Sequence, residues 1–259
     1  MTEPRPVPVP PPLEENSGLA FAGEAPWPAA GLTAAQVLSF QAARNPTGRP
    51  NSDVLRGFVG FQAGRPVEKW RVDFPLHYPE QEAALYVEPC RHLRSRLRDP
   101  AGSWWLNPHA QPALRTALAR LERFLTAPAG TEPPKWGWVD STLLPDESLL
   151  AIARDDDFTH GLLRSRIFQL WWRQHAARLA PALIVGAFPF PWAPATLLSS
   201  LTREQEERRL ALARAARSAD FDQLNSASAA TYGWPSDLLD DELLAQLTAL
   251  NRQRSPAGL

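Results

Sequence analysis

Apolar and polar positions along the chain predict helices in both halves. Thr33 is a helix-capping residue type, and the apolar residues that follow it predict a helix over 33–43. A leucine stripe with spacings of three and four residues predicts an amphipathic helix over 112–126. Further helices are expected over 161–179, 202–231 and 237–254, with Asp156 or Asp157 capping the first of them.

Short runs of β-branched and aromatic residues between these helices predict strands. They cover residues 54–59, 70–74, 103–106, 135–139 and 149–154. Residues 80–98 are expected to be helical in part, interrupted at Pro89. The predicted fold class is therefore α+β, with a mixed strand and helix part followed by a helical C-terminal region.

Composition narrows the choice of function. The chain has 259 residues, with 27 Lys and Arg against 28 Asp and Glu, which excludes a uniformly basic coat for nucleic acid but not a local basic face. Only Lys69 and Lys135 are lysines. Arginine suits bidentate recognition of phosphate and guanine, although a GC-rich coding sequence explains the same bias. The single cysteine excludes a disulfide framework and a cysteine-rich metal site.

The N-terminal residues and the length of the apolar stretches predict the cellular location of the protein. Residues 4–12 are a proline run, expected to form an extended tail. The first residues contain no apolar signal region, and no stretch approaches the length of a membrane span. We therefore expect a cytoplasmic protein with no membrane partner.

Catalytic signatures are sparse. The sequence contains no G-x-S-x-G, Walker A or H-E-x-x-H motif, and its five histidines are dispersed. The acidic run Asp155-Asp156-Asp157 is compatible with a divalent-metal nuclease, but a strand end followed by a helix cap is the favoured interpretation. No cofactor pocket or metal site is predicted.

The predicted helix after this run carries side chains suited to nucleic acid. Arginine, glutamine and histidine reach phosphates and base edges in a DNA groove. They lie opposite the apolar face and are Arg164, Arg166, Arg173, Gln174, His175 and Arg178. A solvated helix face explains the pattern equally well.

Several longer stretches, read in order, resemble a known family. Four sequence segments occur here in the order found near the end of large bacterial DNA methyltransferases. They are RFLTAP, IARDDDFTHGLLRSRIFQLWW, AFPFPW and LNSASAATYGWP. These enzymes are the MmeI-like family of type II (IIG/IIL) restriction-modification enzymes and their methylase-only relatives. The upstream stretch from Ser17 resembles the segment that joins their catalytic and target-recognition domains, so the resemblance covers nearly all of residues 17–254.

The resemblance implies a division of the chain and a role. It implies a connector over 17–76, a target-recognition domain over 77–192 and a helical C-terminal region over 193–259, and the proline run makes residues 1–16 a disordered Pro-rich tail. The family's glycine-rich S-adenosylmethionine motif and its N-P-P-Y motif are not found, since Asn45-Pro46-Thr47-Gly48 lacks the second proline and the aromatic residue. The chain therefore looks like the recognition part without the catalytic domain.

The function implied is sequence-specific binding of double-stranded DNA. The chain would serve as the specificity module of a DNA adenine methyltransferase, with no cofactor of its own and with S-adenosylmethionine on a separate catalytic chain. The candidate DNA-binding residues are Arg115, Arg120, Arg123, Lys135, Arg164, Arg166, Arg173, Gln174, His175 and Arg178. Arg164 and Arg166 are expected at phosphates, and Arg173, Gln174 and His175 at base edges. The aromatic residues nearby, such as Trp171 and Trp172, are expected in the core.

An alternative is a non-functional fragment of a split methyltransferase gene. In the relatives, the segment after the tryptophan-rich helix is longer and polar, whereas residues 178–186 are short and apolar here. The relatives also carry several basic residues where this chain has AGTEPP before Lys135. Both departures remove cations from a DNA-facing surface, and DNA binding weakens with each phosphate that is no longer neutralised.

Overall fold

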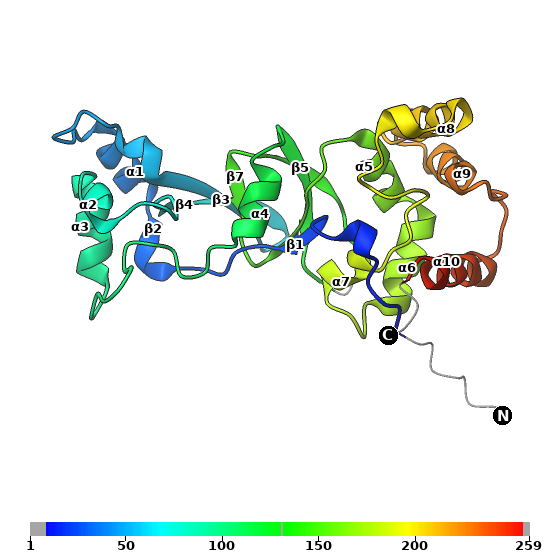
Figure 1. The fold of residues 1–259 in the computed structure, drawn as a ribbon, viewed down its shortest axis with the longest axis horizontal. Helices are drawn as coiled ribbons and strands as arrows, with labels where there is room; N and C mark the ends of the chain where they lie inside the picture. Colours follow the sequence, from blue (N-terminus) through cyan, green and yellow to red (C-terminus); the bar gives the residue numbers. More distant parts are fainter. Residues whose placement is uncertain (1–8, 131, 256–259) are drawn as a thin grey trace. The chain divides into compact units, whose positions relative to one another are not determined.

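The computed structural model describes residues 9–130 and 132–255, and it divides into two compact units that interleave in sequence (Figure 1). The first unit comprises residues 1–21, 121–139 and 150–259, and the second comprises residues 22–120 and 140–149. Helices and two four-stranded sheets are both present, so the predicted α+β class is confirmed. The units divide the chain at other places than the predicted boundaries at 76 and 192.

The second unit is built on a sheet of order β2-β4-β3-β7. The strands are β2 (Gly31–Leu32), β3 (Leu55–Gln62), β4 (Arg65–Val72) and β7 (Leu143–Pro145). Its helices are α1 (Ala34–Ala42), α2 (Glu80–Ala83), α3 (Val87–Arg96) and α4 (Pro112–Leu118). A core of apolar side chains, with Phe74 and Tyr86 fully buried, joins the inner ends of β3 and β4 to α1 and α3.

The first unit holds the other sheet, of order β1-β8-β5-β6, and most of the helices. The strands are β1 (Ala20–Ala22), β5 (Arg123–Pro128), β6 (Gly137–Asp140) and β8 (Leu149–Ile152). The helices are α5 (Asp157–Arg164), α6 (Arg166–His175), α7 (Pro181–Gly186), α8 (Arg203–Ala215), α9 (Phe221–Tyr232) and α10 (Asp240–Arg254). Short 3₁₀ segments in the two units are Glu14–Asn16, Pro28–Ala30, Asn51–Val54 and Leu198–Ser200. Trp171, Trp172 and Phe188 are fully buried at the centre of the core, as predicted.

Helix starts follow local capping chemistry, and the caps predicted at Thr33 and at Asp156 are confirmed. Thr33 and Thr202 each accept a hydrogen bond from the backbone N–H three residues on, where a glutamine reciprocates. Asp156 caps α5 by accepting from the Thr159 N–H at 2.8 Å. Gly233 ends α9 in a left-handed conformation, with φ of 73°.

Several predicted helices end earlier than expected or are broken in two, and one predicted strand does not form. The helix expected over 112–126 ends at Leu118, and the chain continues as strand β5, where Phe124 and Leu125 are buried by sheet pairing and core contacts. The helix over 161–179 is broken at Ser165 into α5 and α6, and the helix over 202–231 is broken before the Asp220 cap of α9. Residues 103–106 form turns, and Pro89 lies in the first turn of α3, where its missing N–H costs no hydrogen bond.

The predicted disordered tail over 1–16 is wrong for its described part. Residues 1–8 lie outside the described residues. Leu13 is buried, and its N–H donates to the carbonyl of Gly186 at 2.9 Å. The buried Asn16 amide donates to the carbonyl of Phe188 at 2.8 Å. These contacts bury apolar surface and satisfy carbonyls at the end of α7, so the segment packs against the helical unit.

No helix within residues 9–130 and 132–255 combines the length and apolarity needed to cross a membrane.

Candidate nucleic-acid interface

Two arginines distant in sequence meet on one carboxylate at the start of α5. Asp157 Oδ1 accepts from Arg123 Nη2 at 3.3 Å, and Asp157 Oδ2 accepts from Arg217 Nε at 2.7 Å. The side chains of Arg123 and Arg217 are 44% and 71% exposed, whereas that of Asp157 is 14% exposed. A mostly buried carboxylate therefore holds two guanidinium groups that keep N–H donors at the surface.

Arg123 is further fixed by an aromatic face. It lies at the first position of β5, and its guanidinium carbon is 3.9 Å from the ring centre of Trp138. Arg123 also donates to the backbone carbonyl of Asp155 at 3.4 Å. A stacked, ion-paired arginine loses little further conformational freedom when it binds an anion. We call Arg123, Arg164 and Arg217 the arginine cluster.

Arg164 and His160 complete this region on α5. Arg164 donates to the carbonyl of Ala216, the residue before Arg217, at 2.7 Å, and its guanidinium lies 5.6 Å from the Phe221 ring. His160 packs edge-on against Trp138. Burial, and next the positive charge of Arg164, lower the pKa of His160 to about 4. The imidazole is therefore neutral at pH 7, and the surface charge comes from the arginines.

The side chains on and after α6 fall into two groups. Arg173 and Arg178 are exposed and Gln174 is partly exposed. Arg166 is paired with Asp240 and also donates to the Leu238 carbonyl at 3.0 Å, so it joins α6 to the start of α10. His175 is 3% exposed and packs against Trp171, with ring centres 4.4 Å apart. Burial lowers the pKa of His175 to about 4, and the ring does not lie on the surface expected for base reading.

Lys135 and Arg120 are exposed, but they belong to different units. Lys135 precedes Trp136, whose indole N–H donates to the Leu163 carbonyl at 3.2 Å and so attaches this segment to α5. Arg120 follows α4 in the second unit.

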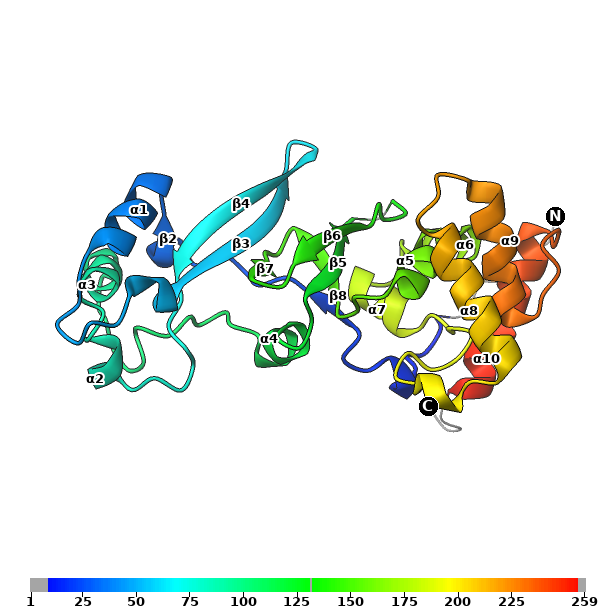
Figure 2. The ribbon, with the colours of Figure 1, turned by 90° about the horizontal axis from the view of Figure 1, so that it is seen from above.

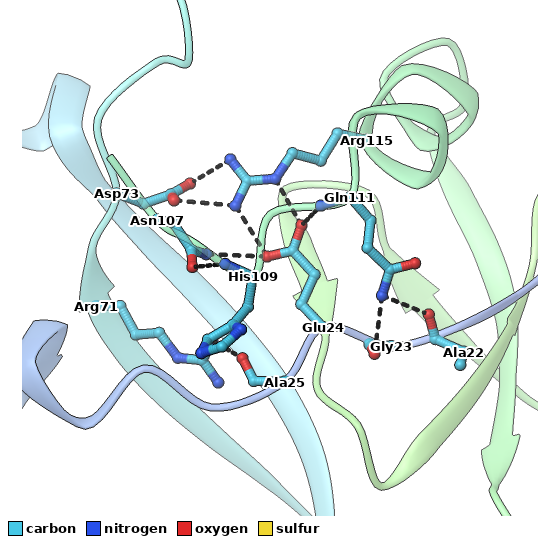
Figure 3. Close-up of polar contacts among 10 residues, drawn as sticks. All are labelled: Ala22, Gly23, Glu24, Ala25, Arg71, Asp73, Asn107, His109, Gln111 and Arg115. Carbon is cyan, nitrogen blue, oxygen red and sulfur yellow. Dashed lines mark hydrogen bonds and ion pairs between the residues drawn. The ribbon is translucent and has the colours of Figure 1, made fainter. Parts of the chain in front are cut away.

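Arg115 lies in an internal ion network of the second unit (Figure 3). It donates to both carboxylate oxygens of Glu24, at 2.6 and 2.8 Å, and to both of Asp73, at 2.9 Å each. Glu24 is fully buried and also accepts from the Gln111 N–H at 2.9 Å and the Asn107 amide at 3.3 Å. Burial would lower the pKa of Arg115, but the hydrogen bond with Glu24 and the charge of Asp73 raise it. The Arg115 guanidinium is therefore engaged in ion pairs within the second unit.

The ten residues predicted for DNA binding therefore do not form one group. Arg123 and Arg164 lie together, whereas Arg115, Arg166 and His175 are engaged or buried inside their own units. Sequence reasoning missed Arg217, because it lay in the middle of the single helix predicted over 202–231. The SAD sequence that follows it, a cap signal for α9, could have shown that the helix ends there.

The acidic run 155–157 serves as a cap and as the partner of arginines. Asp156 caps α5 and accepts from Arg154 Nε at 2.8 Å, and Asp157 binds Arg123 and Arg217. In the part of the chain that the structure describes, no three His, Cys, Asp or Glu side chains are grouped to hold a metal ion. The contacts match the cap interpretation of the sequence.

Comparison with solved structures finds a protein of similar fold. The chain matches a structure of the type IIL restriction-modification enzyme MmeI, solved in complex with DNA, with a TM-score of 0.56 and 15% sequence identity. The fold is similar to part of MmeI. The match covers 98% of this chain and 36% of the MmeI chain, so this chain spans about a third of that enzyme's length. No family model matches the sequence, and no curated protein matches it either.

Proposed function

We propose that this chain is a DNA-binding module related to restriction-modification enzymes. It binds double-stranded DNA sequence-specifically and provides the target specificity of a DNA adenine methyltransferase. The fold likeness carries this proposal, since nearly the whole chain matches part of a restriction-modification enzyme solved with DNA. The order of the sequence segments that resemble the MmeI-like family agrees with this proposal.

The arginine cluster supplies the phosphate contacts in this proposal. Arg123 and Arg217 are held by Asp157 while their remaining N–H donors stay exposed, which suits the oxygens of a DNA backbone. Arg164 adds a third positive charge on α5. Contacts of this kind position a protein on the duplex but carry no sequence information.

Base reading is assigned to one exposed and one partly exposed side chain at the end of α6. Arg173 and Gln174 are the side-chain types that make bidentate contacts with guanine and adenine edges. Arg178, Lys135 and Arg120 are exposed cations that we retain as backbone contacts. Arg115, Arg166 and His175 take no part in this proposal, because their polar groups are paired or buried within the chain.

Methyl transfer is assigned to a separate catalytic chain. That partner would bind S-adenosylmethionine and hold the target adenine outside the helix, while this chain fixes the complex on its recognition sequence. No cofactor is proposed for the chain itself, and no membrane partner.

The decisive experiment is a selection from a randomised duplex library followed by binding measurements. The purified chain should enrich a common sequence, and fluorescence anisotropy should show tighter binding to a selected duplex than to its shuffled counterpart. Arg173→Ala and Gln174→Ala should each relax the preference by roughly 1–3 kcal/mol, because each removes one bidentate hydrogen-bonded pair with a base. Arg252→Ala, a change at an exposed arginine near the end of α10, is the matched control.

The outcomes separate this proposal from the fragment alternative. A folded chain that binds no duplex at low salt would contradict the proposal and favour a non-functional fragment. Binding without sequence preference would contradict the specificity role alone. Adding the cognate methyltransferase should produce site-specific adenine methylation, and methylation of the same sites without this chain would also contradict that role.

A further inference from the structure

The β3–β4 hairpin of the second unit forms a projecting ribbon that no sequence motif marks. Its register pairs Leu55 with Val72 at the inner end and Gln62 with Arg65 at the tip. Figure 2 shows the two strands running together away from α1, α2 and α3 to a narrow end. The turn has only two residues, Ala63 and Gly64, both with positive φ, as in the tight turns that follow the twist of a hairpin.

The tip of this ribbon is exposed on both strands. β7 pairs with β3 only at residues 57–59, and β2 pairs with β4 only at residues 31–32 and 70–71, within the described sheet. Residues 62–66 are all exposed. The tip therefore presents a methyl group, a glycine and the flanking Gln62 and Arg65 side chains. A two-stranded ribbon of this kind fits the major groove of B-DNA, which is about 12 Å wide.

The register separates the charges onto two faces. Because side chains alternate along a strand, Arg65 shares one face with Gln62 and Lys69, whereas Glu68 lies on the other. Gly60 is on the Lys69 face, and a Cβ at that position would lie 2.1 Å from the carboxylate of Asp146, which accepts from Lys69 Nζ at 2.7 Å. Glycine at residue 60 thus lets the carboxylate hold Lys69 against the ribbon.

Two cations of this face, Lys69 and Arg71, also line a hollow near the base of the ribbon. This surface hollow has a volume of about 380 Å³, and its lining includes Lys69, Arg71, Trp70 and Arg96. Arg96, at the end of α3, is exposed and donates to the Gly31 carbonyl at 3.2 Å. Arg65 at the tip and Arg96 at the hollow thus supply exposed positive charge near the two ends of the ribbon, and Lys69 lies along the strand between them.

We infer that this face of the ribbon is a second contact surface for double-stranded DNA. This inference rests on the proposed function, to which it adds a surface in the other unit. Gln62 and Arg65 enter a groove, and Arg96 binds a backbone phosphate near the base of the ribbon. The chemistry recognised is a phosphate-lined groove, for which the donors of arginine and the amide of glutamine are suited.

Salt-dependent anisotropy with a selected duplex tests the inference. Arg65→Ala and Arg96→Ala should each weaken binding by about threefold to thirtyfold at low salt, and each should reduce the slope of log K against log salt by about 0.9 if the change removes one phosphate contact. Arg65→Glu should weaken binding more. Glu68→Gln on the opposite ribbon face, and Arg91→Ala on the exposed side of α3, are matched controls that should leave binding and slope nearly unchanged.

The result also distinguishes the inference from the function on which it rests. If Arg65→Ala and Arg96→Ala bind with wild-type affinity and slope while Arg123→Ala weakens binding, the ribbon is not a DNA contact and DNA binding stands. If the wild-type chain binds no duplex, both proposals fall. If Glu68→Gln and Arg91→Ala weaken binding as much as Arg65→Ala and Arg96→Ala do, the face specificity argued from the register is wrong.

Discussion

Arg115 and Glu24, 91 residues apart in the sequence, form a two-point ion pair, with Nε and Nη2 of the arginine at 2.6 and 2.8 Å from the two carboxylate oxygens. The same guanidinium binds Asp73 on its other side. The Glu24 side chain is fully buried, so water cannot compensate its charge if the arginine is removed. Arg115 thus joins α4 to the segment before β2 through Glu24 and to the residue after β4 through Asp73.

Removing Arg115 should therefore destabilise the second unit strongly. We expect Arg115→Ala to lower the free energy of unfolding by about 3–5 kcal/mol, because it leaves two buried carboxylates without their cation. Urea unfolding followed by tryptophan fluorescence measures this. Arg120→Ala, at an exposed position five residues on, should change stability by less than about 0.5 kcal/mol. A decrease below about 1 kcal/mol for Arg115→Ala would contradict the structural role of the network.

The ion network also shows where sequence reasoning reaches its limit. Arg115 lies on a helix predicted from its leucine stripe, and its position off that stripe suggested a surface role. Its partners Glu24 and Asp73 come from segments whose local patterns say nothing of a buried charge. A pairing of this kind depends on tertiary contacts, and no local periodicity encodes it.

Helix starts, by contrast, could be predicted because their chemistry is local. Thr33, Asp156 and Thr202 cap their helices with side chains that bond to N–H groups three residues away. The break at Ser165 could not be predicted in the same way. There the Arg166 N–H donates to the side chain of Asn225, 59 residues further on, so a distant residue stabilises the start of α6.

The buried His175 and the partly buried His160 should make the fold sensitive to mild acid. The pKa values of His160 and His175 are lowered to about 4, below the value near 6.5 of an exposed histidine, chiefly by burial. Between these values the unfolded chain binds protons that the folded chain does not, so stability falls as pH decreases from about 6.5 to 4 and is constant above that window with respect to these groups.

The pH dependence can be assigned by comparing variants. The free energy of unfolding, measured between about pH 7 and 4 for the wild type and for His175→Leu, should show a smaller decrease in the variant. His109→Leu, at an exposed position, is the control. If the free energy of unfolding changes with pH equally in the wild type and in His175→Leu, the pKa of His175 is the same in the folded and the unfolded chain.

The arginine cluster should determine how DNA binding responds to salt. Arg123→Ala and Arg217→Ala should each weaken binding to a selected duplex and reduce the salt slope by about 0.9, because each removes a phosphate contact. The matched control is Arg203→Ala, since Arg203 on α8 is 93% exposed and paired only along its own helix with Glu207 in the described contacts. Unchanged affinity in both cluster variants would remove Asp157 and its arginines from the interface.

Asp155 allows a test in which a substitution near the arginine cluster should strengthen DNA binding instead of weakening it. Its side chain is exposed, and its backbone carbonyl accepts from Arg123 at 3.4 Å, so this residue carries a negative charge beside the arginine cluster that opposes an approaching phosphate. We expect Asp155→Asn to tighten DNA binding, and the gain should shrink as salt rises because screening weakens the repulsion that the change removes. Anisotropy titrations at several salt concentrations measure both effects. Asp237→Asn, at an exposed position between α9 and α10, serves as a charge-matched control that should bind as the wild type does. Weaker binding by Asp155→Asn would show that this carboxylate supports the interface, and the cluster would then need a partner other than phosphate.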